Sequence, residues 1–295
     1  MRFDFFERLH RLRQTSYIKP QTYRMHRFYI SPNEWNPDAL VLNGSEAHHC
    51  RDVLRMKRGD RAVLFNGCGR EITAEIVDLQ GRAVRLRKLR ESSTPPLRCR
   101  ITLGQAIPKG KNMELIVQKA VEVGASEIAP IISERTIVDL DEREAMQKQV
   151  KWQAVTIEAA KQCGQNWLPH VHTPRKLKEF FTSVEAGVSP AQPAASQPTR
   201  LPLQKNDLRY DLQLIGSLQP DALHLKKILA DFSSEHRYLP SSVLMLIGPE
   251  GDFTPAELAL ARSRGCRPIT LGPIILRVET AAIYCLSILS YELLV

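Results

Sequence analysis

The sequence predicts an α/β protein in which a small β-barrel domain precedes a larger domain built on a parallel sheet. Between residues 101 and 294, short apolar runs alternate with helical patterns, the order typical of parallel sheets. Loops with glycine and proline follow two of these runs, where the carboxyl ends of parallel strands bind ligands. Between residues 62 and 89, apolar and polar residues alternate, which predicts a barrel with one buried face.

Composition and charge limit the class of protein. The chain has 295 residues, enough for two domains, and a formal net charge of +9. This charge favours a polyanionic partner such as nucleic acid, and a general solubility charge is the alternative. No apolar run reaches the roughly 18–20 residues of a membrane span. The cysteines are scattered and the N-terminus has no secretion signal, so we expect a cytoplasmic protein with reduced thiols, no metal and no membrane association.

The first domain is expected at residues 25–93. Residues 1–24 lack sustained periodicity, and they are either a flexible extension or the product of a start codon placed too early. Residues 25–30 begin a new sequence pattern, which predicts a first strand. A short helix is expected at residues 46–54.

A hairpin and a basic strand complete this domain. Residues 62–65 and 71–77 are expected to pair across a glycine-containing turn, with alternate side chains of the second run buried. The next strand, residues 83–89, has arginines at its polar positions. This pattern favours an RNA-docking surface, and a solvated edge strand protected by charge is the alternative.

The second domain is expected at residues 97–295, after a short linker of serine, threonine and proline. The expected strands are 101–107, 128–132, 211–218, 243–247 and 269–271, and the expected helices are 113–123, 141–163, 221–232, 255–264 and 281–294. Residues 183–204 are rich in proline, alanine and serine, which predicts a loop without a core of its own. The last helix is apolar on nearly every face, so it is either buried in the fold or half buried against a second subunit.

The last two strand–loop–helix units carry the candidate site. Thr254 and Glu257 predict a capping box at the start of the first helix. Both loops place charge beside glycine, with Glu250 in the first and Arg277 and Glu279 in the second. Neither loop has the glycine spacing of a dinucleotide or P-loop site. The alternative is that these glycines only form tight turns.

Several separated motifs give the chain a family resemblance. They are Pro108-Lys-Gly, Glu114-Leu-Ile-Val-Gln-Lys-Ala-Val-Glu122, Ser126-Glu-Ile-Ala-Pro-Ile-Ile-Ser-Glu-Arg135, Glu158-Ala-Ala-Lys-Gln-Cys163, Leu246-Ile-Gly-Pro-Glu-Gly251 and Leu271-Gly-Pro…Ile275-Leu-Arg-Val-Glu-Thr-Ala281. With these motifs in this order, the chain resembles the bacterial 16S ribosomal RNA uridine-N3 methyltransferases of the SPOUT class. The resemblance extends from Met25 to the end of the chain.

The resemblance implies a fold, a cofactor and partners. The fold is a PUA-like barrel followed by a SPOUT-type parallel sheet with a deep C-terminal trefoil knot. S-adenosylmethionine binds between the knot loops, the protein is a homodimer through its C-terminal domain, and the target is N3 of uridine 1498 in 16S rRNA or in the small ribosomal subunit. The residues that match the family's cofactor loops are Leu246, Ile247, Gly248, Gly251, Leu271, Gly272, Ile275, Leu276 and Arg277.

The chain departs from the family pattern at three positions. Asp252 stands where the family has a second glycine, Ile274 where it has an arginine, and Val278 where it has a threonine. Ile274 would remove a contact to the cofactor carboxylate or to RNA phosphate. Asp252 would add negative charge beside the methyl donor, which either favours the sulfonium or disturbs the turn. These changes affect the expected contacts more than the expected reaction.

Methylation at N3 requires removal of the N3 proton, and this assigns expected roles to three residues. Arg277 is expected to stabilise the anionic uracil oxygen or to position phosphate. Either Glu250 or Glu279 is expected to accept the proton. The alternative for Arg277 and Glu279 is a structural pair that holds the loop.

RNA binding is expected to use basic residues of both domains. They are Arg27, Lys57, Arg82, Arg85, Arg87, Lys109 and Lys111. For Lys109 and Lys111 an ordinary charged turn is the alternative. Two other functions remain open from the sequence. One is a SPOUT methyltransferase for another rRNA or tRNA nucleotide, and the other is a non-catalytic RNA-binding factor of ribosome assembly.

Overall fold

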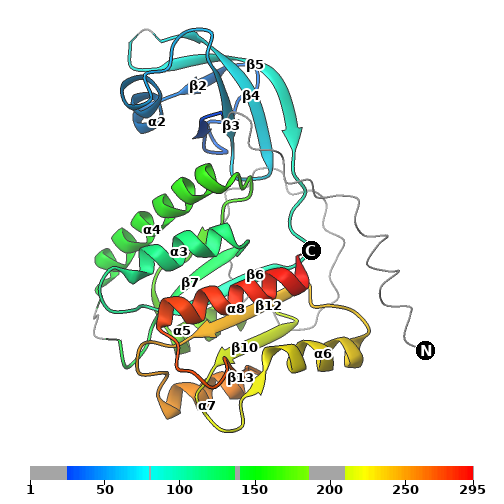
Figure 1. Ribbon diagram of the computed structural model, residues 1–295. Helices are drawn as coiled ribbons and strands as arrows, with labels where there is room; N and C mark the ends of the chain where they lie inside the picture. The colour runs from blue at the N-terminus through cyan, green and yellow to red at the C-terminus, as the bar shows by residue number, and fades with distance from the viewer. Residues whose placement is uncertain (1–24, 80, 137–139, 186–209, 295) are drawn as a thin grey trace, which may run out of the picture.

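The computed structural model describes residues 25–79, 81–136, 140–185 and 210–294. A curled N-terminal sheet lies beside a larger unit in which helices cover both faces of a parallel sheet (Figure 1). The expected extension at residues 1–24 and most of the proline-rich segment lie outside the described residues.

The N-terminal sheet has five strands in the order β1-β3-β4-β5-β2. They are β1 (Arg27–Tyr29), β2 (Leu40–Leu42), β3 (Arg61–Phe65), β4 (Arg70–Asp78) and β5 (Val84–Ser93). The predicted hairpin is confirmed, because β3 and β4 pair antiparallel with Val63 opposite Thr73. Ile72, Ala74 and Ile76 are fully buried on its inner face. The short helix begins earlier than expected, as α2 (Gly44–His48), and continues as the π-helical turn η1 (His49–Val53).

All pairings in the second sheet are parallel, which confirms the fold class. Its order is β11-β13-β10-β12-β6-β7-β8, with β9 also paired to β7. The strands are β6 (Arg100–Ala106), β7 (Glu127–Ile132), β8 (His170–Val171), β9 (Arg175–Lys176), β10 (Leu212–Gly216), β11 (Leu223–His224), β12 (Ser242–Ile247) and β13 (Arg267–Thr270). The trefoil knot implied by the family resemblance stays a prediction.

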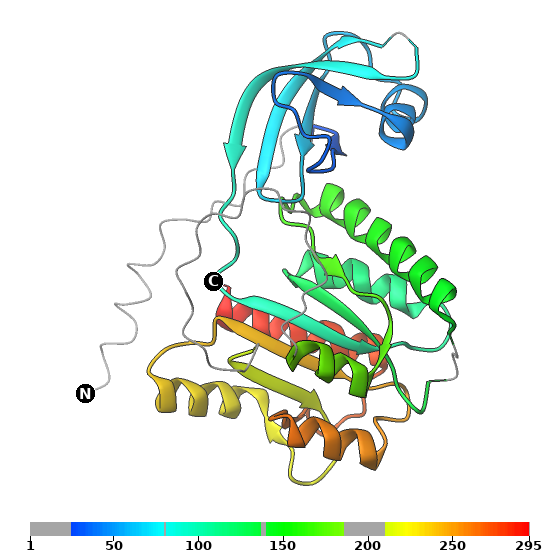
Figure 2. The same cartoon turned by 180° about the vertical axis from the view of Figure 1, so that it is seen from behind.

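In the part of the chain that the structure describes, six helices cover the two faces of this sheet. They are α3 (Asn112–Glu122), α4 (Glu142–Cys163), α5 (Leu177–Glu185), α6 (Leu225–His236), α7 (Pro255–Ser263) and α8 (Val278–Leu293). Helices α3, α4, α6 and α8 contribute to the core on one face, and α5 and α7 to the core on the other (Figures 1 and 2). One side of α8 is buried on the sheet, whereas Tyr284 and Tyr291 are exposed.

The sequence prediction needs correction at several boundaries. Helix α6 begins at Leu225 rather than near Asp221, because the two-residue strand β11 comes first. The last helix begins at Val278 rather than Ala281. Helix α5 was not predicted, and its last residues, 183–185, belong to a helix rather than to the proline-rich loop.

Reciprocal capping boxes begin two of the helices, and the one at Thr254 and Glu257 confirms the prediction. The Asp141 carboxylate accepts from the backbone N–H of Glu144, whose side chain accepts from the backbone N–H of Asp141. Thr254 and Glu257 form the same reciprocal pair at α7. Each box satisfies backbone donors that the first helical turn leaves without a partner. Glu257 also accepts from Ser133 Oγ at 2.9 Å, so the buried carboxylate ties α7 to the loop after β7.

A largely buried ion pair joins the N-terminal domain to the domain that contains the parallel sheet. Lys161 of α4 contacts Glu46 of α2, and their side chains are 12% and 17% exposed. Glu46 also accepts from the backbone N–H of Tyr29 at 3.2 Å. Lys161 has a second partner in Glu158, at 2.8 Å. Removing one member of such a pair leaves the other charge desolvated and without compensation.

Replacing Lys161 by alanine should therefore lower the free energy of unfolding by about 3 kcal/mol, as measured by urea denaturation. The matched control is Lys227→Ala, which removes an exposed ion pair with Asp231 inside α6. That change should cost at most about 0.5 kcal/mol. Equal effects of the two substitutions would show that the interdomain pair does not stabilise the fold.

Candidate functional site

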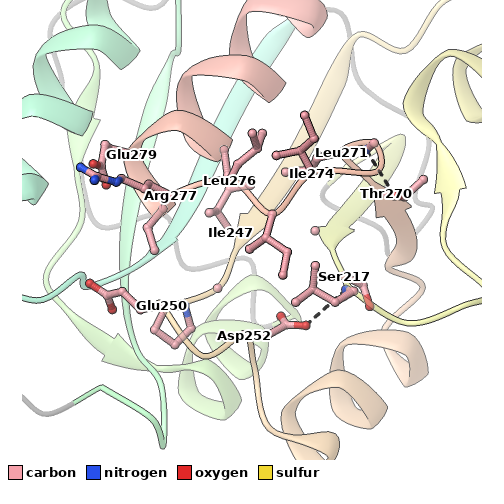
Figure 3. A pocket seen from close by; sticks show the side chains of 18 of the residues that line it. Ser217, Ile247, Glu250, Asp252, Thr270, Leu271, Ile274, Leu276, Arg277 and Glu279 are labelled. Atoms are coloured by element: carbon pink, nitrogen blue, oxygen red, sulfur yellow. Dashed lines mark hydrogen bonds between the residues drawn. The ribbon is translucent and has the colours of Figure 1, made fainter.

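A cavity of about 470 Å³ lies where β10, β12 and β13 end (Figure 3). Its lining comes from loops at the carboxyl ends of these strands and from the first turns of α3 and α8. The lining residues are Asn112, Gly216, Ser217, Leu218, Ile247, Gly248, Pro249, Glu250, Asp252, Thr270, Leu271, Gly272, Ile274, Ile275, Leu276, Arg277, Val278, Glu279 and Ala281. The position agrees with the rule that open α/β sheets bind ligands at this edge.

The loop after β12 folds back on itself at Gly248. A Cβ atom at this position would lie 3.1 Å from the backbone nitrogen of Phe253 and 3.2 Å from Oδ1 of Asp252. A side chain here would push these atoms apart by a few tenths of an ångström, so glycine favours the tight closure of the loop. The backbone N–H of Asp252 donates to the carbonyl of Pro249 at 2.9 Å, which completes the turn. Glu250 is therefore held at the rim of the cavity.

The loop after β13 supplies most of the apolar lining. Leu271 and Leu276 are half buried against the main core, whereas Ile274 and Ile275 are 74% and 79% exposed. The Thr270 hydroxyl accepts from the backbone N–H of Gly272 at 3.3 Å, which fixes the start of this loop. One wall of the cavity is thus well packed, and the outer part of the loop is open to solvent.

A third loop, after β10, was missed in the sequence. Gly216, Ser217 and Leu218 line the cavity beside the two expected loops. The backbone N–H of Ser217 donates to the carbonyl of Ile269 at 3.0 Å, so this loop is anchored to β13. A signal was present, because Gly216 and Ser217 follow an apolar run in the way that Gly248 follows β12.

Three charged residues of the site lie at one side of the cavity. Figure 3 shows Arg277, Glu279 and Glu250 on that side, and Ser217 and Thr270 on the other. Arg277 is the N-cap residue of α8 and its side chain is exposed. The helix therefore adds the partial positive charge of its N-terminus beside the guanidinium. Within the described residues, Arg277 and Glu279 form no ion pair, so the alternative of a structural pair receives no support.

Both candidate carboxylates are hydrogen bonded to residues 109–112, which form the loop after β6 and the first residue of α3. The backbone N–H of Lys109 donates to Oε1 of Glu250 at 2.9 Å. The side-chain amide of Asn112 donates to Oε2 of Glu279 at 3.3 Å. These bonds hold the segment that carries Lys109 and Lys111 against the cavity, and both lysines are exposed there.

Most of the expected cofactor residues line the cavity, with two exceptions. The side chain of Leu246 packs in the core on the opposite face of the sheet, because successive side chains of a strand alternate between faces. Gly251 lies beyond the rim, where its carbonyl accepts from the guanidinium of Arg135. The departures at Asp252, Ile274 and Val278 all fall in the lining itself.

The expected RNA-binding residues fall into two groups. Lys57, Arg82, Arg85 and Arg87 are exposed on the N-terminal domain, where Arg87 also contacts Glu75 at 3.2 Å. Arg27 does not join them. Its guanidinium is 13% exposed and donates to Glu71 and to Asn166, each at 2.6 Å, within the contact between the two domains. The structure therefore gives Arg27 a role in holding the domains together.

Other site classes find no support in the described part of the chain. It contains no cluster of three or more metal-ligating side chains. None of its helices has the length and apolar character needed to cross a bilayer. All six cysteines are free, and burial raises the pKa of Cys266 and of Cys285 to about 12, so both thiols stay protonated at neutral pH.

Comparison with protein families matches both parts of the chain. Residues 95–290 match a family model described as an RNA methyltransferase domain. Residues 42–89 match a model described as an RNA methyltransferase PUA domain. The first match covers the whole cavity, and the second covers most of the N-terminal sheet.

Individual relatives agree with the family models. The ribosomal RNA small subunit methyltransferase E of Synechocystis is 30% identical over 263 residues, which cover 89% of this chain and 76% of that protein. The protein of the same name from Bacillus subtilis is 29% identical over 91% of this chain and 97% of its own length.

Two solved structures with a bound cofactor are similar to this one. A methyltransferase from Legionella pneumophila in complex with SAM has a TM-score of 0.74 at 31% identity and covers 92% of this chain and 98% of its own. The ribosomal RNA small subunit methyltransferase E of Neisseria gonorrhoeae, bound to S-adenosyl methionine, has a TM-score of 0.70 at 28% identity, with 91% and 98% coverage.

Proposed function

This chain belongs to the RNA methyltransferase family, and from that premise we propose that it transfers a methyl group from S-adenosylmethionine to N3 of a uridine in 16S rRNA. The proposed nucleotide is uridine 1498 of the small ribosomal subunit. The relatives named as small-subunit rRNA methyltransferases support the substrate. The observation that carries the proposal is the cavity after β10, β12 and β13, with an arginine and two carboxylates at one side.

The cavity fits S-adenosylmethionine in size and in lining. Its volume of about 470 Å³ lies within the usual range of roughly 300–1,000 Å³ for small-molecule sites. Ile247, Leu271 and Leu276 offer an apolar surface for the adenine ring. The bound cofactor supplies the methyl group as a sulfonium, so it needs no metal. The remaining chemistry falls to groups of the protein.

Arg277 is proposed to stabilise the deprotonated uracil. Uracil N3 attacks the methyl carbon through its lone pair, so its proton must leave before or during transfer. The resulting negative charge spreads over the two neighbouring carbonyl oxygens of the base. The exposed guanidinium of Arg277 and the N-terminus of α8 place positive charge at this point of the cavity.

Glu250 or Glu279 is proposed to accept the N3 proton. Each uses one carboxylate oxygen in a hydrogen bond to the segment before or at the start of α3. In the described structure, the second oxygen of each carboxylate accepts no hydrogen bond and can take a proton. As N3 bonds to the methyl carbon, the bond from carbon to sulfur breaks and its electron pair stays on sulfur. Holding the reacting atoms in line supplies much of the remaining acceleration.

RNA is proposed to bind across both domains. N3 belongs to the Watson–Crick edge, so the target base must be unpaired or turned out of its helix. Arg82, Arg85 and Arg87 on the N-terminal sheet, with Lys57, would hold the RNA backbone. Lys109 and Lys111 would contact it beside the cavity. The net charge of +9 supports a polyanionic substrate.

We propose that the functional oligomer is a homodimer that forms through the C-terminal domain. Four large side chains are exposed on α8 and on the loop before it: Ile274 at 74%, Ile275 at 79%, Tyr284 at 46% and Tyr291 at 75%. Exposed apolar groups of this size support an interface with a second copy. We propose that the dimer acts in the cytoplasm, where ribosomal subunits are assembled.

A non-catalytic RNA-binding factor is the second candidate, because Asp252 and Ile274, two of the expected departures from the family pattern, both line the cavity. Isothermal titration with S-adenosylmethionine separates the two candidates. The enzyme should bind the cofactor with a dissociation constant in the micromolar range and transfer labelled methyl to small ribosomal subunits. RNA binding without cofactor binding would favour the assembly factor. Transfer to a nucleotide other than a uridine would indicate a different rRNA or tRNA substrate.

A further inference from the structure

Asp252 adopts a backbone conformation that residues other than glycine rarely adopt. Its φ is +62°, in the left-handed region. The residue lies in the turn between β12 and α7, where its backbone N–H donates to the carbonyl of Pro249. A glycine would adopt this conformation without strain. A strained residue that lines a binding cavity indicates a functional use of its side chain.

The Asp252 carboxylate bonds to two different loops. Oδ1 accepts from the backbone N–H of Phe253 at 2.7 Å, within its own turn. Oδ2 accepts from the backbone N–H of Leu218 at 3.3 Å, in the loop after β10 (Figure 3). A glycine at this position offers neither acceptor. The side chain therefore connects two of the three loops that form the cavity.

The loop after β10 is anchored to β13 through the backbone N–H of Ser217, and from Leu218 onward it needs a further connection close to the cavity. Leu218 lines the cavity, yet its side chain is 66% exposed, so packing holds it only weakly. The Ser217 hydroxyl accepts from the backbone N–H of Gln219 at 3.2 Å, which orders the loop internally. Further along the loop, Asp221 pairs with Arg262 of α7 at the solvent-exposed side. Among the described contacts, the hydrogen bond that the Leu218 backbone N–H donates to Asp252 is the one that joins Leu218 to a side chain.

We propose that Asp252 is a positioning residue that holds the loop after β10 as a preformed wall of the cofactor cavity. The inference deepens the proposed function of this cavity and rests on it. Asp252 acts through the Leu218 backbone, so it sets affinity for S-adenosylmethionine rather than the chemical step. A preformed wall spares the cofactor the cost of ordering the loop when it binds.

The test compares Asp252→Gly with the wild-type protein. Glycine removes the carboxylate but relieves the backbone strain, so the melting temperature should stay the same or rise. Affinity for S-adenosylmethionine, measured by titration, should fall about tenfold, the scale of one hydrogen bond. The KM for S-adenosylmethionine should rise with it, whereas kcat at saturating cofactor should change less than about twofold. Amide exchange at Leu218 in the cofactor-free protein should become faster.

Two further variants separate positioning from general stability. Asp252→Asn keeps one acceptor for Phe253 but turns an amide toward the Leu218 N–H, so it should weaken cofactor binding with little change in melting temperature. Asp221→Asn is the matched control in the same loop, because it removes the outer ion pair with Arg262 and leaves Leu218 bonded. Its cofactor affinity should equal that of the wild type.

The outcomes distinguish this inference from the proposed function. Wild-type protein that binds no S-adenosylmethionine would overturn both. Wild-type binding together with undiminished binding by Asp252→Gly overturns the inference alone. An equal loss of affinity in Asp221→Asn and Asp252→Gly would also overturn it, because the effect would then come from loosening of the loop as a whole.

Discussion

Replacing Arg277 by alanine should abolish methyl transfer, lowering kcat by about 10³-fold, while the protein still folds and binds S-adenosylmethionine. Removing one group that stabilises developing negative charge typically costs about 10²–10³ in rate. Arg277 lies at the charged side of the cavity and forms no ion pair within the described residues, so its charge is available to substrate. Transfer of labelled methyl to small ribosomal subunits measures the rate, and titration calorimetry measures cofactor binding.

Two neighbouring changes make this result specific. Arg277→Lys keeps the charge but loses the planar donor group, so it should retain part of the activity. Thr280→Ala changes an exposed residue of the same helix that does not line the cavity, and it should transfer methyl at the wild-type rate. Near-normal turnover of Arg277→Ala would exclude the arginine from the chemistry.

Neutralising the basic strand of the N-terminal domain should weaken RNA binding and flatten its salt dependence. If Arg82, Arg85 and Arg87 each contact one phosphate, the slope of log K against log salt should become shallower by about two to three in the triple alanine variant. Three such contacts account for about a 20- to 40-fold loss of affinity between 50 and 200 mM salt. The measurement is RNA binding at several salt concentrations.

A charge-matched control decides whether the effect is local. The triple alanine variant of Lys178, Lys226 and Lys227 removes the same charge from exposed positions on α5 and α6. It should keep the wild-type slope. Neither triple variant should change affinity for S-adenosylmethionine, because none of the six substituted residues lines the cavity. Equal losses of RNA affinity would show that net charge, and not the basic strand, governs binding.

The features that were predictable from the sequence are those determined by neighbours in the chain. The capping boxes at Asp141 and Thr254 each need only residues three apart. The buried strand β12 is a continuous apolar run from Val243 to Ile247, and β6 is a shorter apolar pattern, each bounded by loop residues. These local signals were enough to place two of the three cavity loops, because parallel strands present their loops at the same edge.

The features that were not predictable depend on residues far apart in the sequence. From the sequence, Arg27 was expected to bind RNA with the other basic residues. In the structure its guanidinium donates to Glu71 and Asn166 at the contact between the two domains. Strands β8, β9 and β11 have two residues each, too few for any periodicity. From the sequence, Asp252 was expected either to favour the sulfonium or to disturb the turn. Only the structure shows the distant backbone group from which its carboxylate accepts a hydrogen bond.

The most direct test of the central claim is the modification map of 16S rRNA from a strain that lacks this gene, determined by mass spectrometry. We expect the loss of a single N3-methyluridine, at position 1498. The wild-type gene should restore the methyl group, and the gene for Arg277→Ala should not. An unchanged map, or the loss of a modification on another nucleotide, would contradict the account.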